Sequence, residues 1–134
     1  MKTENKPKIF LLGTESERLL YLSLLEEEGV NADISEDEDL KSVLEKAVLN
    51  TEAFSLILAT SAIRIDDELT LDGIYEGQPI KTFIKSKSEN LFILCFSSIP
   101  EQRIGANFDF FVSSHPKNSE KVFVQKIKSI LIGK

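Results

Sequence analysis

Short apolar runs alternate with helix-like segments along almost the whole chain. The runs are nearly continuous, which is typical of parallel strands that are buried on both faces. We expect strands at residues 9–12, 32–35, 54–59, 91–96 and 108–112, and helices at residues 15–28, 35–49, 79–84 and 120–132. This order of elements predicts an α/β protein with a five-stranded parallel sheet between two layers of helices.

The patterns also predict where several elements lie. The run at 91–96 is the most hydrophobic and is expected at the centre of the sheet, whereas the weaker run at 32–35 is expected at an edge. Ser35, which acids follow, is the expected start of the second helix. Side chains expected to face the core are Leu19, Leu20, Leu22, Leu24 and Leu25 in the first helix, Leu40, Val43, Leu44, Ala47 and Val48 in the second, and Val122, Phe123, Ile127, Ile130 and Leu131 in the last.

Five strands in a chain of 134 residues match the flavodoxin-like doubly wound fold, in which ligands bind beyond the carboxyl ends of the strands. The stretch from Ser97 to Gly105 is too short for an ordinary crossover helix, so we expect the fourth helix to be shortened or missing. Residues 61–77 are expected to form an acidic connection that contains glycine. We expect a single domain over residues 1–134, with a flexible polar N-terminus at 1–7.

Charge and cysteine content narrow the functional classes. The chain carries 22 acids against 16 Lys and Arg, a net charge of −6, which makes nucleic acid an unlikely partner. The acids concentrate in residues 1–76 and the bases in residues 77–134, which suggests two differently charged faces. The single cysteine, the absence of a bilayer-length apolar run and the polar first residues lead us to expect a cytoplasmic protein without a membrane partner.

The chain resembles a response-regulator receiver domain of the CheY-like superfamily. The stretches that carry the resemblance are residues 9–15, 24–30, 35–37, 54–60 and 71–73, together with Ser97, Gly105-Ala106 and His115-Pro116. Receivers have an apolar strand that ends in two acids, a strand that ends in the phosphorylated aspartate, and a Ser or Thr after the fourth strand. The resemblance implies the doubly wound fold and a role in two-component signal transduction.

The residues that receivers use for phosphotransfer are mostly replaced in this chain. The resemblance places the degenerate site at Gly13, Thr14, Glu15, Thr60, Ser97, Ser114 and His115. Gly13 and Thr14 stand where the family has acids that hold Mg²⁺, and Thr60 stands at the nucleophile position. The Lys position falls at Ser114 or His115, so only Ser97 is retained in kind. We therefore expect a pseudo-receiver that is not phosphorylated on aspartate.

Other residues are candidates for chemistry. Asp66, Asp67, Glu68 and Asp72 form a possible ligand or metal loop, although their spacing matches no calcium-binding motif and acidic runs are usually solvated surface. His115 is a candidate base without a partner pattern, and Cys95 lies in an apolar strand as inert packing. We therefore nominate no catalytic residue and no metal ligand set.

Two further hypotheses concern ligands and partners. The loop at 13–16 follows a strand and precedes a helix, so its amides could bind the phosphate of FMN, but the glycine-rich fingerprints are missing. The basic positions Lys117, Lys121, Lys126 and Lys128 either meet an acidic partner or form the solvated face of the last helix. We expect no cofactor: Mg²⁺ and FMN remain open as ligands, but no motif supports either of them.

The favoured function is that of a non-phosphorylatable receiver-like module, not an enzyme, that binds another signalling protein or an output domain, with a homodimer as a further option. One alternative is a small flavodoxin-like protein or enzyme that binds FMN or a phosphate ligand. A second alternative is an atypical phosphoreceiver that uses Asp66 or Asp67.

Overall fold

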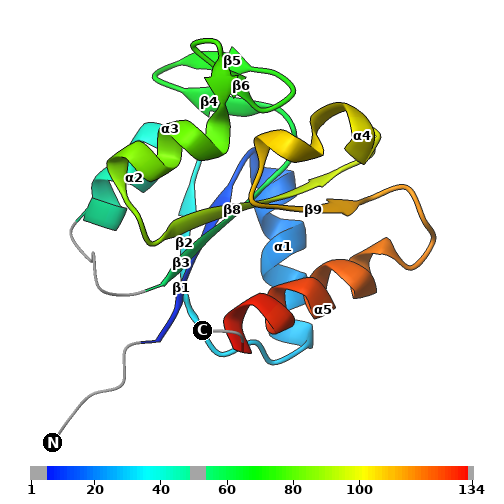
Figure 1. Cartoon of the computed structure of the whole chain (residues 1–134). Coiled ribbons are helices and arrows are strands. Elements are labelled where there is room, and N and C mark those ends of the chain that lie inside the picture. The colour runs from blue at the N-terminus through cyan, green and yellow to red at the C-terminus, as the bar shows by residue number, and fades with distance from the viewer. Residues whose placement is uncertain (1–5, 49–53, 133–134) are drawn as a thin grey trace, which may run out of the picture.

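A computed structural model describes residues 6–48 and 54–132 and contains a five-stranded parallel sheet (Figure 1). The strand order is β2-β1-β3-β8-β9. Their bounds are Lys8–Leu12 for β1, Asp33–Asp37 for β2, Ser55–Ala59 for β3, Leu91–Ser97 for β8 and Phe110–Ser113 for β9. The position of β1 between β2 and β3 is that of a doubly wound sheet, so the predicted flavodoxin-like fold is confirmed.

Helices cover both faces of this sheet. In Figure 1, α1 (Glu15–Glu27) and α5 (Ser119–Ile132) lie on one face, and α2 (Leu40–Val48) and α3 (Ile80–Lys87) lie on the other. Successive residues of β1 point to opposite faces, so Phe10 packs in the core beneath α2 and α3, whereas Ile9 and Leu11 pack in the core beneath α1 and α5. The two cores explain why the interior strands β1, β3 and β8 are almost continuously apolar.

The predicted reduction of the fourth helix is also found. The link between β8 and β9 holds only α4 (Glu101–Ile104) and a 3₁₀ turn at Gly105–Asn107. Strand β2 lies at an edge as predicted, and β8 is an interior strand. The middle position, however, belongs to β3 and not to β8, because both strands are almost fully buried and hydrophobicity alone does not rank them.

Residues 61–77 do not form a simple connection. They fold, with the two residues that follow, into two antiparallel hairpins, which we call the double hairpin (residues 63–79). In the first, β4 (Ile63–Ile65) pairs with β5 (Glu68–Thr70), and in the second, β6 (Ile74–Tyr75) pairs with β7 (Gln78–Pro79). Both turns have two central residues with positive φ, at 66–67 and 76–77, as two-residue hairpins prefer.

The start predicted for the second helix is wrong. Ser35 and Asp37 belong to β2, where they pair with Phe10 and Leu12 of β1, so the chain is still extended at these positions. Helix α2 begins at Leu40, one residue after Asp39, whose side chain accepts a hydrogen bond from the Lys41 N–H at 2.8 Å. Pairing with β1 therefore outweighs the local capping preference of Ser35.

The predicted inward faces of the helices need correction at four positions. Leu19 and Leu20 of α1, Val48 of α2 and Val122 of α5 are exposed. In α1 the buried side chains are Tyr21 and Leu25, because the helix presents a narrower stripe to the sheet than its leucines suggest. The first residues of the expected flexible N-terminus, 1–5, lie outside the described residues. Within the described ranges, no helix has the length and hydrophobicity needed to span a membrane.

Candidate functional site

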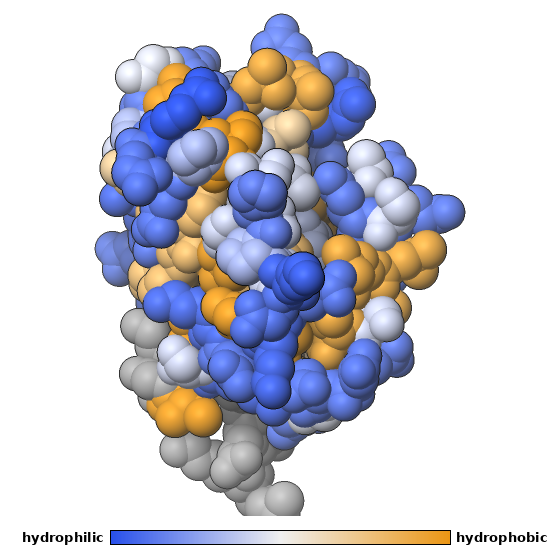
Figure 2. Space-filling view, turned by 90° about the vertical axis from the view of Figure 1, so that its right-hand side faces the viewer, coloured by the Kyte–Doolittle hydropathy of each residue, from blue (hydrophilic) through white to orange (hydrophobic). Residues whose placement is uncertain are grey.

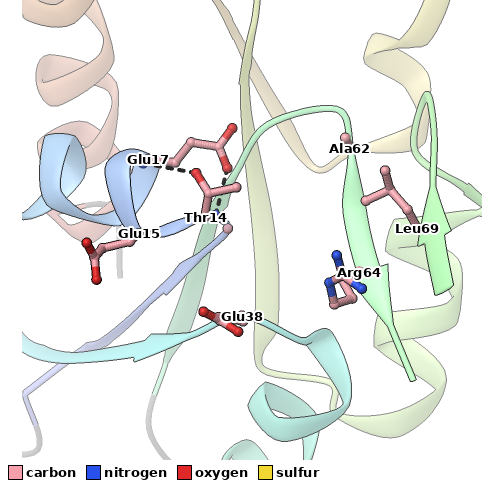
Figure 3. Close-up of a pocket in the computed structure, with 8 residues that line it drawn as sticks. Thr14, Glu15, Glu17, Glu38, Ala62, Arg64 and Leu69 are labelled. Carbon is pink, nitrogen blue, oxygen red and sulfur yellow. Dashed lines mark hydrogen bonds between the residues drawn. The ribbon is translucent and has the colours of Figure 1, made fainter. Parts of the chain in front are cut away.

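A cavity of about 360 Å³ opens at the carboxyl edge of the sheet, between the start of α1 and the first hairpin (Figure 3). We call it the carboxyl-edge cavity. Gly13, Thr14, Glu15, Glu17, Glu38, Ala62, Arg64 and Leu69 line it. Ligands of doubly wound folds bind at this edge, so the cavity is the candidate site that the fold itself indicates.

The loop after β1 is closed by a capping box. Thr14 is the N-cap of α1, and its Oγ1 accepts a hydrogen bond from the Glu17 N–H at 3.3 Å. In return, Glu17 Oε1 accepts a hydrogen bond from the Thr14 N–H at 2.9 Å. The Thr14 N–H is therefore already hydrogen-bonded to the Glu17 carboxylate. A phosphate would have to displace Glu17 in order to bind this N–H.

Gly13 cannot simply be replaced by the acid that receivers have in this loop. Its φ is 147°, a conformation that side-chain-bearing residues rarely adopt. A Cβ added at Gly13 would also overlap with Glu17 Oε1, the oxygen that accepts from the Thr14 amide. The loop therefore requires glycine at position 13, and an acid could not be introduced there without displacing Glu17.

Charge is arranged unevenly around the cavity. Glu15 and Glu17 lie in the first turn of α1 and Glu38 lies between β2 and α2. Figure 3 shows these three acids opposite Arg64 of β4. Glu38 pairs with Arg18 at 3.6 Å, whereas Arg64 makes no ion pair or hydrogen bond within the described residues. Leu69 faces Arg64 across the hairpin register and adds an apolar wall. The cavity can therefore accept a group that is both basic and apolar.

Asp39 anchors the first hairpin to the sheet. Besides capping α2, its carboxylate accepts hydrogen bonds from the N–H groups of Asp66 at 3.1 Å and Asp67 at 3.2 Å. Partial burial by itself would raise the pKa of the Asp39 carboxyl, but the three backbone N–H groups and the Arg64 guanidinium outweigh it and lower the pKa below its ordinary value. The hairpin is held by a charged acceptor that serves two elements at once.

The hydroxyl groups predicted at the site close local turns. Thr60 Oγ1 donates to the Ala62 carbonyl at 3.2 Å and lies 3.3 Å from the Ala62 N–H, from which it accepts. Ser97 Oγ accepts from the Ile99 N–H at 3.1 Å, and the Ser114 N–H donates to the Ser97 carbonyl at 2.9 Å. The imidazole of His115 is exposed. None of Thr60, Ser97, Ser114 and His115 lines the carboxyl-edge cavity, so the structure joins only Gly13, Thr14 and Glu15 of the predicted set within it.

The acidic loop does not gather around a common point. Asp66 and Asp67 are the two turn residues of the first hairpin, and the Asp66 carboxylate lies 3.7 Å from Lys41 Nζ. Glu68 follows them in β5, and Asp72 precedes the second hairpin, where its carbonyl accepts from Asn107 Nδ2. Across residues 6–48 and 54–132, no three acids, cysteines or histidines are grouped so that they could hold a metal ion.

Comparisons with known proteins leave the site without a family. The chain matches no protein-family model, and no curated protein and no solved structure is significantly similar to it. The assignment of the fold therefore depends on the strand order and helical layers described above.

Several residues of the site were missed by the sequence analysis. Glu17 completes, with the predicted Thr14, the Thr-x-x-Glu spacing of a capping box, which could have identified it. Arg64 is the only base between residues 61 and 77, a signal that was also available. No local pattern places Glu38 and Asp39 beside the first hairpin, because that arrangement depends on residues 63–70 folding back over them.

Proposed function

We propose that the chain is a receiver-like module that does not accept a phosphoryl group and that binds another protein in signal transduction. The observation that carries the proposal is the display of apolar side chains on the double hairpin. Leu69, Leu71 and Ile74 are 58%, 62% and 42% exposed. Figure 2 shows hydrophobic surface at the top of the molecule, where the double hairpin lies in Figure 1.

These side chains are displayed on an anchored scaffold. Asp39 holds the first hairpin, and Asn107 Nδ2 donates to the Asp72 carbonyl at 2.8 Å between the hairpins. The ring of Tyr75 in the second hairpin packs edge-on against Phe83 of α3, with 4.7 Å between the ring centroids. A rigid surface loses little conformational entropy on binding, which favours association through exposed apolar groups.

The charges beside the leucines indicate the chemistry of the partner. Glu15, Glu17 and Glu38 line the cavity next to Leu69, and Asp66 and Asp67 form the hairpin tip. A partner segment with aliphatic and basic side chains would match both features, since complementary charge guides encounter and excludes wrong partners. The proposed partner therefore presents a basic, apolar segment to the double hairpin.

The phosphotransfer part of the proposal is tested by intact mass. After incubation with acetyl phosphate and Mg²⁺, we expect no phosphoryl adduct, because Gly13, Thr14 and Thr60 offer no acid group at the receiver positions. An adduct that disappears in Asp66→Asn or Asp67→Asn would overturn this part and support the atypical phosphoreceiver. A gain of thermal stability with FMN would support the flavodoxin-like alternative instead.

The binding part is tested by quantitative co-purification from the native host with tagged variants. Leu69→Asp combined with Leu71→Asp should remove the specific partner. Leu19→Asp is the matched control, because Leu19 is similarly exposed, at 55%, but lies on α1. The proposal fails if the double variant retains the partner at the wild-type level, or if Leu19→Asp removes it equally well.

A further inference from the structure

The two edges of the sheet differ in how they are protected. The edge strand β2 has the sequence Asp-Ile-Ser-Glu-Asp, and its acids disfavour pairing with another strand. The other edge strand, β9, has the sequence Phe-Phe-Val-Ser, without charge or proline. Within residues 6–48 and 54–132, β8 is the only strand that pairs with β9. The β9 edge therefore lacks the charges and the proline that often prevent strand addition.

The surroundings of β9 leave room for an added segment. The fourth helix, which could have covered this side, is reduced to the four residues of α4. A groove of about 280 Å³ runs between β9 and the start of α5, lined by Phe111, Val112, Ser113 and Val122 among others. Val122 is 45% exposed and was expected to be buried, so it offers an apolar contact beside the edge.

Positive charge surrounds this groove. Lys126 lines it, with its Nζ 5.4 Å from the centroid of the Phe110 ring. Lys117 is exposed and lies between Pro116 and Asn118, which both line the groove, and Lys121 is exposed next to Val122. None of these three lysines makes an ion pair within the described part of the chain.

We propose that β9 binds an extended, acid-flanked apolar segment of a partner protein, which adds a strand to the sheet. Backbone N–H and C=O groups at the open edge provide the hydrogen bonds, Val122 and Phe111 contact alternate apolar side chains, and Lys117 and Lys126 pair with the acids. This surface differs from the double hairpin in location and in charge, so it is independent of the function proposed above.

The same charges argue against other occupants. Pairing of β9 with β9 of a second copy would bring the lysines of the two grooves toward each other. Nucleic acid would find only three lysines here on a chain with a net charge of −6, and it does not use strand hydrogen bonds. An acidic extended peptide can form hydrogen bonds with the open edge of β9 and ion pairs with the lysines.

The test uses the full chain and a synthetic peptide with alternating Val and Thr residues between two acids at each end. Binding is measured by fluorescence anisotropy, and the site is mapped by the exchange of backbone amides at residues 110–113. We expect the acid-flanked peptide to bind at least about tenfold more tightly than a lysine-flanked version, and to slow exchange at β9. A version with proline at the Thr positions should lose binding, because it lacks the N–H donors.

Charge reversal provides the matched variants. Lys117→Glu combined with Lys126→Glu should weaken the acid-flanked peptide about tenfold and reverse the preference for flanking charge. Lys81→Glu combined with Lys87→Glu, which changes the net charge equally but lies on α3, should leave both affinities unchanged. The proposal is overturned by equal binding of both peptides, by protection outside β9, by preferential binding of a single-stranded oligonucleotide, or by self-association that protects residues 110–113.

Discussion

Glu17 shows how one side chain can determine what a loop binds. Its carboxylate accepts from the Thr14 N–H at 2.9 Å, at the start of α1 where an anion would otherwise be favoured. Gly13 leaves the space that this carboxylate occupies. The loop is therefore stabilised as a helix cap, and an anionic ligand would have to compete with an internal carboxylate.

Cys95 gives a prediction at the same scale. It is fully buried in β8, and burial raises the pKa of its thiol from 9.0 to about 12. At pH 8 the folded protein should resist iodoacetamide, and the thiol should react only after unfolding in urea. Alkylation of the folded protein at the rate of a free thiol would contradict the burial.

The raised pKa also predicts a loss of stability at high pH. The folded state retains the Cys95 proton above pH 9, where the unfolded state loses it, so this contribution is complete below pH 9 and is lost as pH rises toward 12. The free energy of unfolding should therefore fall by up to about 1.4 kcal/mol per pH unit in this interval. Urea unfolding of wild type and Cys95→Ala isolates the effect, because the variant should show a shallower decline.

At the scale of elements, Asp39 joins α2 to the first hairpin. Asp39→Ala removes the helix cap and leaves the Asp66 and Asp67 amides without their acceptor, so we expect a loss of about 1–3 kcal/mol. Amide exchange at the hairpin turn should become faster in the same variant. Asp33→Ala is the control, since Asp33 is exposed in β2, and an equal effect there would contradict the anchoring role.

Gly73 of the double hairpin packs closely against Phe108, which lies in the segment between β8 and β9. Its φ is 73°, and a Cβ there would lie 2.5 Å from Cζ of Phe108, which is buried. Gly77 has nearly the same φ, 76°, but open space around it. We expect Gly77→Ala to cost about 1 kcal/mol through backbone strain and Gly73→Ala to cost roughly 2–4 kcal/mol, because the clash is added. Chemical denaturation of both variants measures the difference, and equal costs would show that Phe108 moves aside freely.

For the whole molecule, the acidic and basic halves of the sequence contribute to two different surfaces of the fold. Glu15, Glu17 and Glu38 line the carboxyl-edge cavity and Asp66 and Asp67 form the hairpin tip, whereas Lys126 lines the groove beside β9. Figure 1 places the double hairpin above one end of the sheet and β9 along its side. Two proposed surfaces of opposite charge on one small domain would allow it to link two partners.

Independence of the two surfaces is a testable property of the whole molecule. Leu69→Asp combined with Leu71→Asp should change the affinity of the acid-flanked peptide for β9 by no more than about twofold, because distant sites act additively. Fluorescence anisotropy with the purified variant measures this affinity. A larger change would mean that the double hairpin and β9 are coupled through the sheet.

Most of the fold was predictable because its signals are local. The apolar runs that form β1, β3 and β8 are continuous, and the short link after Ser97 limits the fourth helix by length alone. The double hairpin was missed although Asp72-Gly73 and Glu76-Gly77 are turn signals, since its strands are only two or three residues long. The site was predictable only in part, because Glu38, Arg64 and Leu69 meet Thr14 through contacts distant in sequence.

The amino-acid sequence by itself determined the α/β class, the number of parallel strands, the reduced fourth helix and the acidic and basic halves, because each depends on local pattern, composition or chain length. Only the tertiary structure decided that Glu17 occupies the Thr14 amide within the candidate site, that Asp39 holds a hairpin 27 residues away, and that β9 is left as an unprotected edge. These features depend on which strands pair and which loops fold back, and pairing is set by burial summed over the whole sheet.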